Sequence, residues 1–413
     1  MIREMCKKAK VAAFEMGKLS TDAKNAALHK MASALEANIE KILAANEEDV
    51  QVAKSKGVKA ALLDRLGLDR KKIQTMAKEL REVSALPDPI GSIISTWTRP
   101  NGLIISQVRV PMGVVGVIYE SRPNVTADSA GICIKSGNAV ILRGGSDALN
   151  SNLAIGEVLR EALLSTNVPV DAIQVVPSPD RKVAEELMGM REYIDVLVPR
   201  GGADLIKTVI EKSRIPVIET GTGNCHVYVE EDADLQKATP IVINSKCQRP
   251  GTCNAAEKLL VHSKIAKQYL PVVISELRKN GVEVRGDEET RKIVPDVKAA
   301  TEQDWGTEYL DLIMGVKVVK GLDEAIAHIN NYGTHHSDSI LTTDFGKAMQ
   351  FIKEIDSAAV YWNASTRFTD GNQFGLGAEI GISTQKLHVR GPMSVQHLTT
   401  TKYVILGDGQ TRK

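Results

Sequence analysis

From Gly113 onward, short apolar runs alternate with helical stretches, and this alternation constrains the fold more than any other feature of the chain. The first set of runs comprises VVGVIYE, AVILRG, AIQVVPS, IDVLVP and IPVIE, separated by segments such as 151–164 that carry one apolar face. Strands that alternate with helices form mostly parallel, doubly wound sheets. The sequence therefore predicts an α/β fold.

Beyond about residue 222 the alternation resumes, which predicts a second doubly wound α/β domain. Its expected helices cover 264–279, 322–331 and 346–356, and its expected strands are KLLVH, VEVRG, LIMGVKVV, DSILT and AAVYWN. A chain of 413 residues is long enough for two or three domains.

Residues 1–85 differ from this pattern and are expected to be helical, with Ser20 as one N-cap. The apolar stripe that follows this cap comprises Leu28, Met31, Leu35, Ile39, Ile42 and Leu43. These helices carry no candidate chemical groups and are expected to form a docking layer.

A β-hairpin outside the main sheets is predicted for residues 91–110, where two β-rich runs flank the turn Pro100-Asn101-Gly102. The tail 388–413 contains one further strand-like run, HLTTTKYVIL. An exposed edge strand must be paired or protected. The hairpin and the tail together therefore predict a sheet between the subunits of a homo-oligomer, a dimer or a tetramer.

Composition excludes several classes of function. Lys plus Arg (52) nearly cancel Asp plus Glu (51), so no net field favours nucleic acid or an anionic membrane. No apolar run approaches the roughly 18 residues that span a bilayer, and the N-terminus fits neither a signal peptide nor a transit peptide. The five cysteines are few, odd in number and scattered, which favours a reducing compartment, by default the cytoplasm.

The most distinctive local segment is Cys247-Gln-Arg-Pro-Gly-Thr-Cys253, a loop that precedes an apolar run. A thiol becomes a nucleophile where backbone N–H groups or a base stabilise its thiolate. Cys247 and Cys253 are too far apart for a CxxC pair, and no other Cys or His pair has ligand spacing, so no metal is expected. An isolated cysteine is more often a small buried apolar residue. The assignment of Cys253 as nucleophile therefore depends on its neighbours.

Glu219 and Asn124 each follow a predicted strand, where parallel α/β sheets place their ligands. Glu219 is then either an acid or base of an active site or a solvated loop acid. Asn124 opens a predicted helix, so its side chain could cap that helix, donate to a developing oxyanion, or do both.

Phosphate-binding signatures are weak. The chain has no GxGxxG after its first predicted strand and no GxxxxGK. Two predicted strands end in Arg-Gly-Gly, at Arg143-Gly144-Gly145 and Arg200-Gly201-Gly202. Either segment could present backbone N–H groups and a guanidinium to a phosphate.

Taken in order, these segments resemble the aldehyde dehydrogenase superfamily from about residue 110 to 390. In that superfamily an Asn in a Pro-Asn segment, a strand-end Lys, a Gly-rich helix opening, a strand-end Glu, a Gly-x-Cys loop and a Glu-x-Phe segment recur. The matching positions are Asn124, Arg143, Gly201, Gly202, Glu219, Cys253 and Glu308. Cys253 follows Glu219 by 34 residues, which also fits.

Within the superfamily, YESRPNVTAD, RPGTCNAAE and IETGTGNCHVYV are most similar to the branch that reduces γ-glutamyl phosphate in proline biosynthesis. The resemblance implies a cofactor-binding domain over 1–221, interrupted by the oligomerisation hairpin, a catalytic domain over 222–387 and an oligomerisation tail over 388–413. It also implies a thioacyl intermediate on Cys253, reduction by NADPH to glutamate 5-semialdehyde, and release of phosphate.

The resemblance assigns cofactor contacts to Arg143, Gly144, the pair Gly201 and Gly202, and Glu308. Hydrolytic aldehyde dehydrogenases carry Lys-Pro-x-Glu where this chain has Arg143-Gly-Gly-Ser, so the acid that would bind the adenosine ribose hydroxyls is absent. A cationic side chain without that acid can accommodate a 2′-phosphate. NADPH is therefore expected rather than NADH.

The substrate's charged groups need partners, and Arg122, His336 and Arg367 have suitable chemistry. The role of Glu219 stays open between a proton acceptor for the thiol and a structural acid, because water attack on the thioester would waste the activated substrate.

Two rivals remain: a hydrolytic or CoA-acylating aldehyde dehydrogenase, and a catalytically silent scaffold. Whether the chain forms a complex with the glutamate 5-kinase that makes its substrate is equally open.

Overall fold

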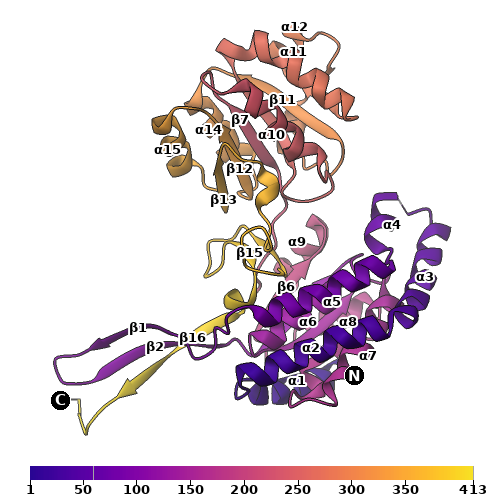
Figure 1. The fold of residues 1–413 in the computed structure, drawn as a ribbon, viewed down its shortest axis with the longest axis vertical. Coiled ribbons are helices and arrows are strands. Elements are labelled where there is room, and N and C mark those ends of the chain that lie inside the picture. The colour runs from indigo at the N-terminus through magenta and orange to yellow at the C-terminus, as the bar shows by residue number, and fades with distance from the viewer. Residues whose placement is uncertain (59, 413) are drawn as a thin grey trace. The chain divides into compact units, whose positions relative to one another are not determined.

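The computed structural model describes residues 1–58 and 60–412, and the chain divides into two compact units. The first unit comprises 1–220, 375–381 and 392–413, and the second comprises 221–374 and 382–391. Figure 1 shows their elements in order of the chain. Each unit contains a parallel sheet with helices on both faces, the doubly wound architecture that the alternating pattern predicts.

The sheet of the first unit has the strand order β5-β4-β3-β6, and all its described pairings are parallel. Its strands are β3 (Val114–Tyr119), β4 (Ala139–Gly144), β5 (Ile173–Val175) and β6 (Val196–Arg200). Every residue of β3 and β4 is buried. Burial on both faces explains why these strands read as continuous apolar runs rather than as alternating ones.

Helices cover both faces of this sheet. They are α1 (Ile2–Met16), α2 (Thr21–Ala37), α3 (Ile39–Ser55), α4 (Ala60–Leu66), α5 (Arg70–Ala85), α6 (Asn124–Lys135), α7 (Leu149–Leu163), α8 (Arg181–Met188) and α9 (Ala203–Lys212). Helix α1 packs beside α8, while α2 and α5 pack on α6, and α3 on α7. Ser20 caps α2 by accepting the N–H of Ala23 at 3.3 Å, as predicted. The helical character expected for residues 1–85 is thus observed in α1 to α5, and their role as a docking layer stays a prediction.

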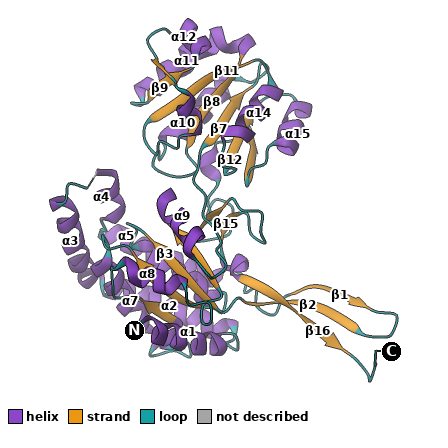
Figure 2. Cartoon of the chain, turned by 180° about the vertical axis from the view of Figure 1, so that it is seen from behind, coloured by secondary structure: helices purple, strands orange, loops and turns teal. Residues whose placement is uncertain are grey.

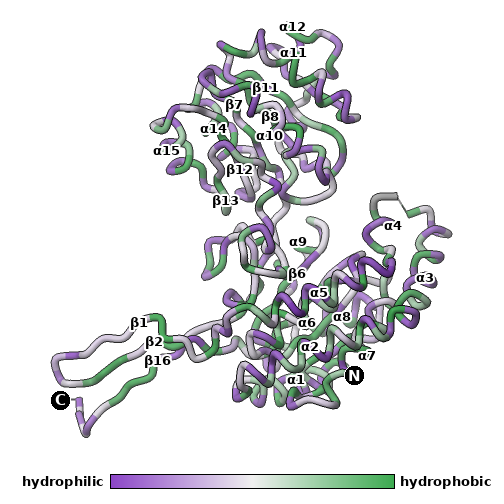
Figure 3. Tube along the Cα trace, in the orientation of Figure 1, coloured by the Kyte–Doolittle hydropathy of each residue, from purple (hydrophilic) through white to green (hydrophobic). Residues whose placement is uncertain are grey.

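A separate three-stranded antiparallel sheet, which we call the flap, extends from the first unit (Figure 1). It consists of β1 (Ile93–Thr98), β2 (Ile104–Pro111) and β16 (Thr399–Leu406), with β2 in the centre. The predicted hairpin and the predicted last strand therefore both form, and they pair with each other. Figure 3 shows hydrophobic residues along these strands, and Ile405 and Leu406 are exposed.

The sheet of the second unit has the order β10-β9-β11-β8-β7-β12-β13, with parallel pairings throughout. Its strands are β7 (Cys225–Val229), β8 (Ala256–His262), β9 (Glu283–Gly286), β10 (Lys298–Ala299), β11 (Ile313–Val319), β12 (Ser337–Leu341) and β13 (Ala359–Trp362). Its helices are α10 (Leu235–Cys247), α11 (Ser263–Lys279), α12 (Glu288–Ile293), α13 (Glu302–Gly306), α14 (Leu322–Tyr332) and α15 (Phe345–Glu354).

Alternate residues of β7 supply the two cores of this unit. Val227 and Val229 join the core under α10 and α11, whereas Tyr228 joins the core under α14 and α15. This division follows from the alternation of side chains along a strand. Figure 2 shows the two pairs of helices on either side of the sheet. Because β7 is hydrogen-bonded to β8 on one side and to β12 on the other, the starting points of the loops that precede and follow it are held in place.

Two predictions about strands need correction. The run Ile215–Glu219 (IPVIE) is not a strand, because only Val217 forms an isolated bridge, with Leu197. Pro216 has no N–H to donate to a longer ladder. The bridge consists of two hydrogen bonds: the N–H of Leu197 donates to the carbonyl of Pro216 at 2.8 Å, and the N–H of Ile218 donates to the carbonyl of Leu197 at 2.9 Å. Conversely, β7 was not among the predicted strands although it lies in the middle of its sheet.

The chain passes between the units through β14 (Gly381–Ser383) and β15 (Gly391–Met393), which pair as a two-stranded sheet. Among the described residues, no helix combines the length and the apolar character that crossing a bilayer requires.

Candidate active site

Cys253 lies in the loop between α10 and β8, three residues before the strand begins, and is half-buried. The thiol of Cys225, the first residue of β7, donates to the carbonyl oxygen of Cys253 at 3.1 Å. Burial raises the pKa of the Cys225 thiol well above its ordinary value, so this residue stays protonated and acts as a donor. The backbone of the candidate nucleophile is thus held by a hydrogen bond from a neighbouring strand.

Asn254, the residue after Cys253, is held by the segment around Thr366. Thr366 donates to the carbonyl of Asn254 at 2.7 Å, and the Asn254 amide donates to the carbonyl of Thr369 at 2.8 Å. Arg367 donates to the side-chain oxygens of Asn254 and Gln248. The structure therefore brings the predicted substrate residue Arg367 to the nucleophile loop.

A second cation lies beside Arg367. Burial, and then the positive charge of Arg249, lower the pKa of the Arg367 guanidinium. Arg249 is exposed, and it lies between Cys247 and Cys253 in the sequence. Two neighbouring cations beside a nucleophile favour an anionic substrate.

Glu308 also lies at this end of the sheet. Its carboxylate accepts the N–H of Gly223 at 2.7 Å. A Cβ on Gly223 would overlap the backbone of Cys253, so only glycine allows this close approach. Gly223 therefore contacts both Glu308, the predicted cofactor residue, and Cys253, the predicted nucleophile.

His336 is almost fully buried and directly precedes β12. Its Nδ1 lies 2.8 Å from the Ser337 hydroxyl and 3.9 Å from the Cys225 sulfur. Cys253, Glu308 and His336 precede β8, β11 and β12 respectively, and all three strands are parallel members of one sheet. The second unit thus carries its candidate groups at the amino ends of its strands.

The first unit carries its candidate groups at the opposite, carboxyl ends of its strands. Asn124 and Arg122 follow β3, Arg143 and Gly144 end β4, and Gly201 follows β6. This is the edge at which doubly wound sheets usually bind their ligands.

Asn124 is the first residue of α6, and its side chain does not cap that helix. Its amide donates instead to Asp128 Oδ2 at 2.8 Å, one turn further along. Burial, and then the negative charge of Glu79, raise the pKa of the Asp128 carboxyl well above its ordinary value. The prediction that Asn124 caps this helix is therefore wrong. Asp128 orients the Asn124 amide and accepts one of its two N–H groups, so the second N–H does not take part in this hydrogen bond. Arg122 is half-buried in the turn before this helix.

Arg143 is 8 % exposed and donates to the carbonyl of Pro179 at 2.8 Å and that of Asp180 at 3.3 Å. Its buried Nε has no hydrogen-bond partner among the described residues. Charges of both signs lie near it: the guanidinium of Arg181, which the sequence analysis did not single out, and the carboxylates of Glu120, Asp180 and Asp147. A Cβ on Gly144 would overlap the side chain of Asn152, so this glycine is required for packing.

Gly202 is the N-cap residue of α9, and its N–H donates to the Glu120 carboxylate at 3.1 Å. A Cβ on Gly201 would overlap the same carboxylate. A carboxylate thus occupies the position where a helix N-terminus binds anions. A phosphate at this point would have to displace the Glu120 carboxylate from the N–H of Gly202, because like charges repel.

Glu219 is half-buried and lies two residues beyond the Val217 bridge, so it does not end a strand. Glu219 and Thr220 are the last two residues of the segment 1–220 of the first unit. The Thr220 hydroxyl donates to the carbonyl of Pro199 at 2.7 Å. Asn124 and Glu219 belong to one unit and Cys253 to the other. The geometry that would join them stays a prediction.

Outside these segments, the described residues contain one group with the spacing of metal ligands: Glu230, Glu231 and His262. The ammonium of Lys347 lies 3.2 Å from each of the two glutamates, so a cation already balances their charge. This group carries no argument for a metal.

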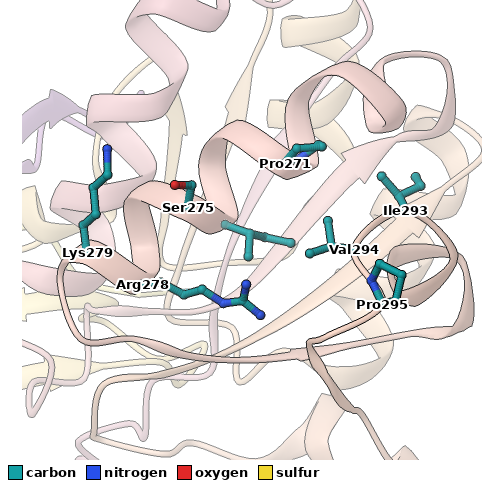
Figure 4. Close-up of a pocket in the computed structure, with 8 residues that line it drawn as sticks. Pro271, Ser275, Arg278, Lys279, Ile293, Val294 and Pro295 are labelled. Atoms are coloured by element: carbon teal, nitrogen blue, oxygen red, sulfur yellow. The ribbon is translucent and has the colours of Figure 1, made fainter.

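A groove of about 510 Å³ lies between α11 and residues 293–295 (Figure 4). It is lined by Pro271, Ile274, Ser275, Arg278, Lys279, Ile293, Val294 and Pro295. None of these is a candidate site residue, and Arg278 is paired with Asp296 at 2.7 Å.

The sequence analysis missed several residues that support the site: Gly223, Asn224, Cys225, Arg249, Glu257 and Lys258. One signal could have found two of them, because Glu257 and Lys258 are adjacent charges inside the apolar run AEKLLVH. Charges are almost never fully buried unless they are paired.

Comparisons with known proteins agree with this arrangement. The family model described as "Aldehyde dehydrogenase family" matches residues 1–307. A γ-glutamyl phosphate reductase of Thermoanaerobacter pseudethanolicus is 59 % identical over 407 residues, covering 98 % of this chain and 98 % of that protein. The crystal structure of γ-glutamyl phosphate reductase from Thermotoga maritima matches with a TM-score of 0.97 and 54 % identity over 100 % of both chains.

A more distant solved structure, γ-glutamyl phosphate reductase from Saccharomyces cerevisiae, is 31 % identical with a TM-score of 0.55, covering 99 % of this chain and 98 % of that chain. The family model covers well over half of the chain, and the bacterial relatives cover nearly all of it. The chain therefore belongs to the aldehyde dehydrogenase family and, within it, to the γ-glutamyl phosphate reductases.

Proposed function

We propose that this chain reduces L-glutamyl 5-phosphate to L-glutamate 5-semialdehyde with NADPH, releasing phosphate, as a step of proline biosynthesis. The observation that carries the proposal is the anchored loop of Cys253, with Arg367 and Arg249 beside it, in a chain of this family. A thiol beside two cations suits a substrate that is an acyl phosphate with a carboxylate. Among the described residues the five cysteines form no disulfide, and a chain of this kind suits a reducing compartment, by our proposal the cytoplasm.

In the proposed mechanism, the Cys253 thiolate attacks the acyl carbon, the bond from carbon to the phosphate oxygen breaks, and phosphate leaves. The resulting thioester is then reduced at the same carbon. Each tetrahedral adduct carries an oxyanion, for which the Asn124 amide is the side-chain donor. Collapse of the second adduct returns the thiolate and releases the aldehyde. Glu219 is assigned either to accept the thiol proton or to a structural role.

The residues present fit a nicotinamide dinucleotide. Glu308 would hold the ribose next to the nicotinamide, and Gly201 and Gly202 would face a phosphate at the start of α9, where Glu120 now places an anion. The bound cofactor supplies the hydride. We assign Arg122, His336 and Arg367 to the substrate, and Arg143 and Gly144 to the adenosine end of the cofactor.

The reverse reaction tests the proposal most directly. Purified protein should reduce NADP⁺ in the presence of glutamate 5-semialdehyde and phosphate, and should give no turnover when phosphate is omitted. A hydrolytic aldehyde dehydrogenase would turn over without phosphate, and a CoA-acylating enzyme would require coenzyme A. Either outcome would refute the proposed reaction.

Arg143→Ala tests the preference for NADPH. The buried Nε without a partner and the neighbouring Arg181 favour a 2′-phosphate at this point. Because a hydrogen bond to a charged group contributes more than a neutral one, the KM for NADPH should rise about 10- to 100-fold while that for NADH stays nearly constant. Arg214→Ala, at an exposed cation of the same unit, is the control. An equal effect on both cofactors would count against the 2′-phosphate role.

We also propose that the flap pairs with a second copy of the chain. Ile405 and Leu406 on the edge strand β16 are more than half exposed, and open edges of this kind invite pairing. Ile405→Asp should weaken self-association at least about tenfold, measured by sedimentation equilibrium, because it places a charge in an apolar contact. Lys402→Gln, at an exposed polar position of the same strand, should have no such effect.

A further inference from the structure

Three charged residues next to the nucleophile loop are completely buried: Lys246 in the last turn of α10, and Glu257 and Lys258 at the start of β8. The exposed fraction of each is 0 %. Removing an ion from water is costly, and a buried ion pair is often no more stabilising than apolar residues of the same size. A structural strand would fill these positions with apolar side chains at lower cost. The burial of these charges therefore needs another explanation, which their contacts provide.

Glu257 connects two separate segments. Its Oε2 lies 2.9 Å from the ammonium of Lys246, and its Oε1 accepts the N–H of Leu310 at 3.2 Å. Lys246 stands at the end of the helix that leads into the Cys253 loop, whereas Leu310 follows Glu308 by two residues. The carboxylate thus joins the base of the nucleophile loop to the Glu308 segment.

Leu310 has an unusual backbone conformation, with φ of +54°. A leucine in the left-handed region is strained, and such a conformation persists only where the surroundings impose it. The Leu310 side chain is 38 % exposed, so its packing contributes little to that restraint. The hydrogen bond to Glu257 is the buried contact that holds this residue.

Lys258 restrains the other side of Glu308. Its ammonium donates to the carbonyl of Thr307 and to Asn224 Oδ1, both at 2.8 Å. Asn224 in turn donates to the carbonyl of Trp305 at 2.8 Å. Two consecutive residues of β8 therefore hold positions 307 and 310, which flank Glu308.

These contacts bear on catalysis because Glu308 accepts the N–H of Gly223, which packs directly against the backbone of Cys253. We propose that Glu257 is a positioning residue: together with Lys246 it holds Leu310 in the left-handed conformation and so fixes the Glu308 carboxylate relative to Cys253. The inference rests on the proposed function in one respect, the assignment of Glu308 to the nicotinamide ribose. Glu257 itself touches neither substrate nor cofactor.

The test removes both members of the ion pair, so that neither Lys246 nor Glu257 is left buried without the other. The double variant Lys246→Met with Glu257→Leu removes the acceptor for the Leu310 N–H, and apolar substitution of a buried pair is often neutral for folding. The KM for NADPH should rise about tenfold, the loss expected when a buried N–H loses its partner, while kcat falls less. The rate at which iodoacetamide alkylates Cys253 should stay within about twofold of that of the parent protein.

Adding Leu310→Gly to the double variant separates positioning from a general structural effect. Glycine adopts positive φ without strain, so the triple variant should recover a KM for NADPH within about threefold of the parent value. Glu230→Gln is the matched control, because Glu230 is a buried, ion-paired glutamate just after β7 whose side-chain partners among the described residues include Tyr228, His262 and Lys347. That control should leave the KM for NADPH unchanged.

Two outcomes would overturn the inference: an unchanged KM for NADPH in the double variant, or no recovery in the triple variant. Failure of the proposed function is distinguishable by binding measurements on the parent protein. If the parent binds no NADPH by calorimetry, the assignment of the cofactor fails. If parent and double variant bind NADPH equally well, only the positioning role of Glu257 fails.

Discussion

Cys253→Ser is expected to abolish reduction of γ-glutamyl phosphate while leaving the fold and the binding of NADPH intact. A serine hydroxyl stays protonated at neutral pH, and no acyl intermediate forms without the thiolate. The expected loss in kcat is roughly 10⁴- to 10⁶-fold, the range found when the nucleophile or its partners are removed from a covalent catalyst. The measurement is single-turnover oxidation of NADPH together with the release of phosphate. Retained activity with stoichiometric phosphate release would exclude the thioacyl mechanism.

The matched control for this experiment is Cys247→Ala, which removes the other half-buried cysteine, six residues before Cys253 in the same segment. It should keep activity close to that of the parent. The remaining thiols, Cys6, Cys133 and Cys225, are buried, and burial raises the pKa of each. Alkylation at neutral pH should therefore label the parent and Cys247→Ala at Cys253, and should label Cys253→Ser hardly at all.

Strands buried on both faces could be predicted well from the sequence, because their apolar runs are continuous. The run AVILRG became β4 with the predicted bounds, Ala139–Gly144. The run IPVIE is also mainly apolar but contains Pro216, which has no N–H for a ladder, and only an isolated bridge at Val217 forms. The opposite error occurred at β7, a fully buried interior strand in which the polar His226 interrupts the apolar run.

The sequence predicts which residues belong to the candidate site, but not how they are arranged or which contacts hold them. The expectation that functional groups follow strands holds for Asn124 and Arg143. It does not describe the second unit, where Cys253 and Glu308 precede β8 and β11. The contacts that fix these residues join positions 28 to 85 residues apart, such as Cys225 with Cys253 and Gly223 with Glu308. Local sequence patterns contain no information on such pairs.

Charged residues inside an apolar run are visible in the sequence, but an analysis of hydrophobic periodicity does not interpret them. Glu257 and Lys258 interrupt an apolar strand, which lowers the strength of the strand signal. In the structure the same two residues hold the segment around Glu308. A charged residue inside a predicted core strand therefore indicates a buried polar network.

Asn124→Ala should lower kcat about 100- to 1000-fold, the usual effect of removing one donor from an oxyanion site. The structure supports this role through orientation: one N–H of the Asn124 amide is committed to Asp128 at 2.8 Å, which turns the nitrogen, rather than the oxygen, toward the acid. The second N–H is then available to an oxyanion. Since that charge develops only in the transition state, the KM for γ-glutamyl phosphate should change far less than kcat.

Asn150→Ala is the matched control for this variant, because Asn150 is also exposed, lies in the first turn of its helix and donates to a carboxylate, that of Glu48. Its kcat should equal that of the parent. A loss below about tenfold in Asn124→Ala would contradict the oxyanion role, since a lost transition-state donor costs more than this. A loss that appears wholly in KM would instead assign Asn124 to substrate binding, because uniform binding leaves kcat unchanged. Steady-state kinetics of both variants over one range of substrate concentrations separates these outcomes.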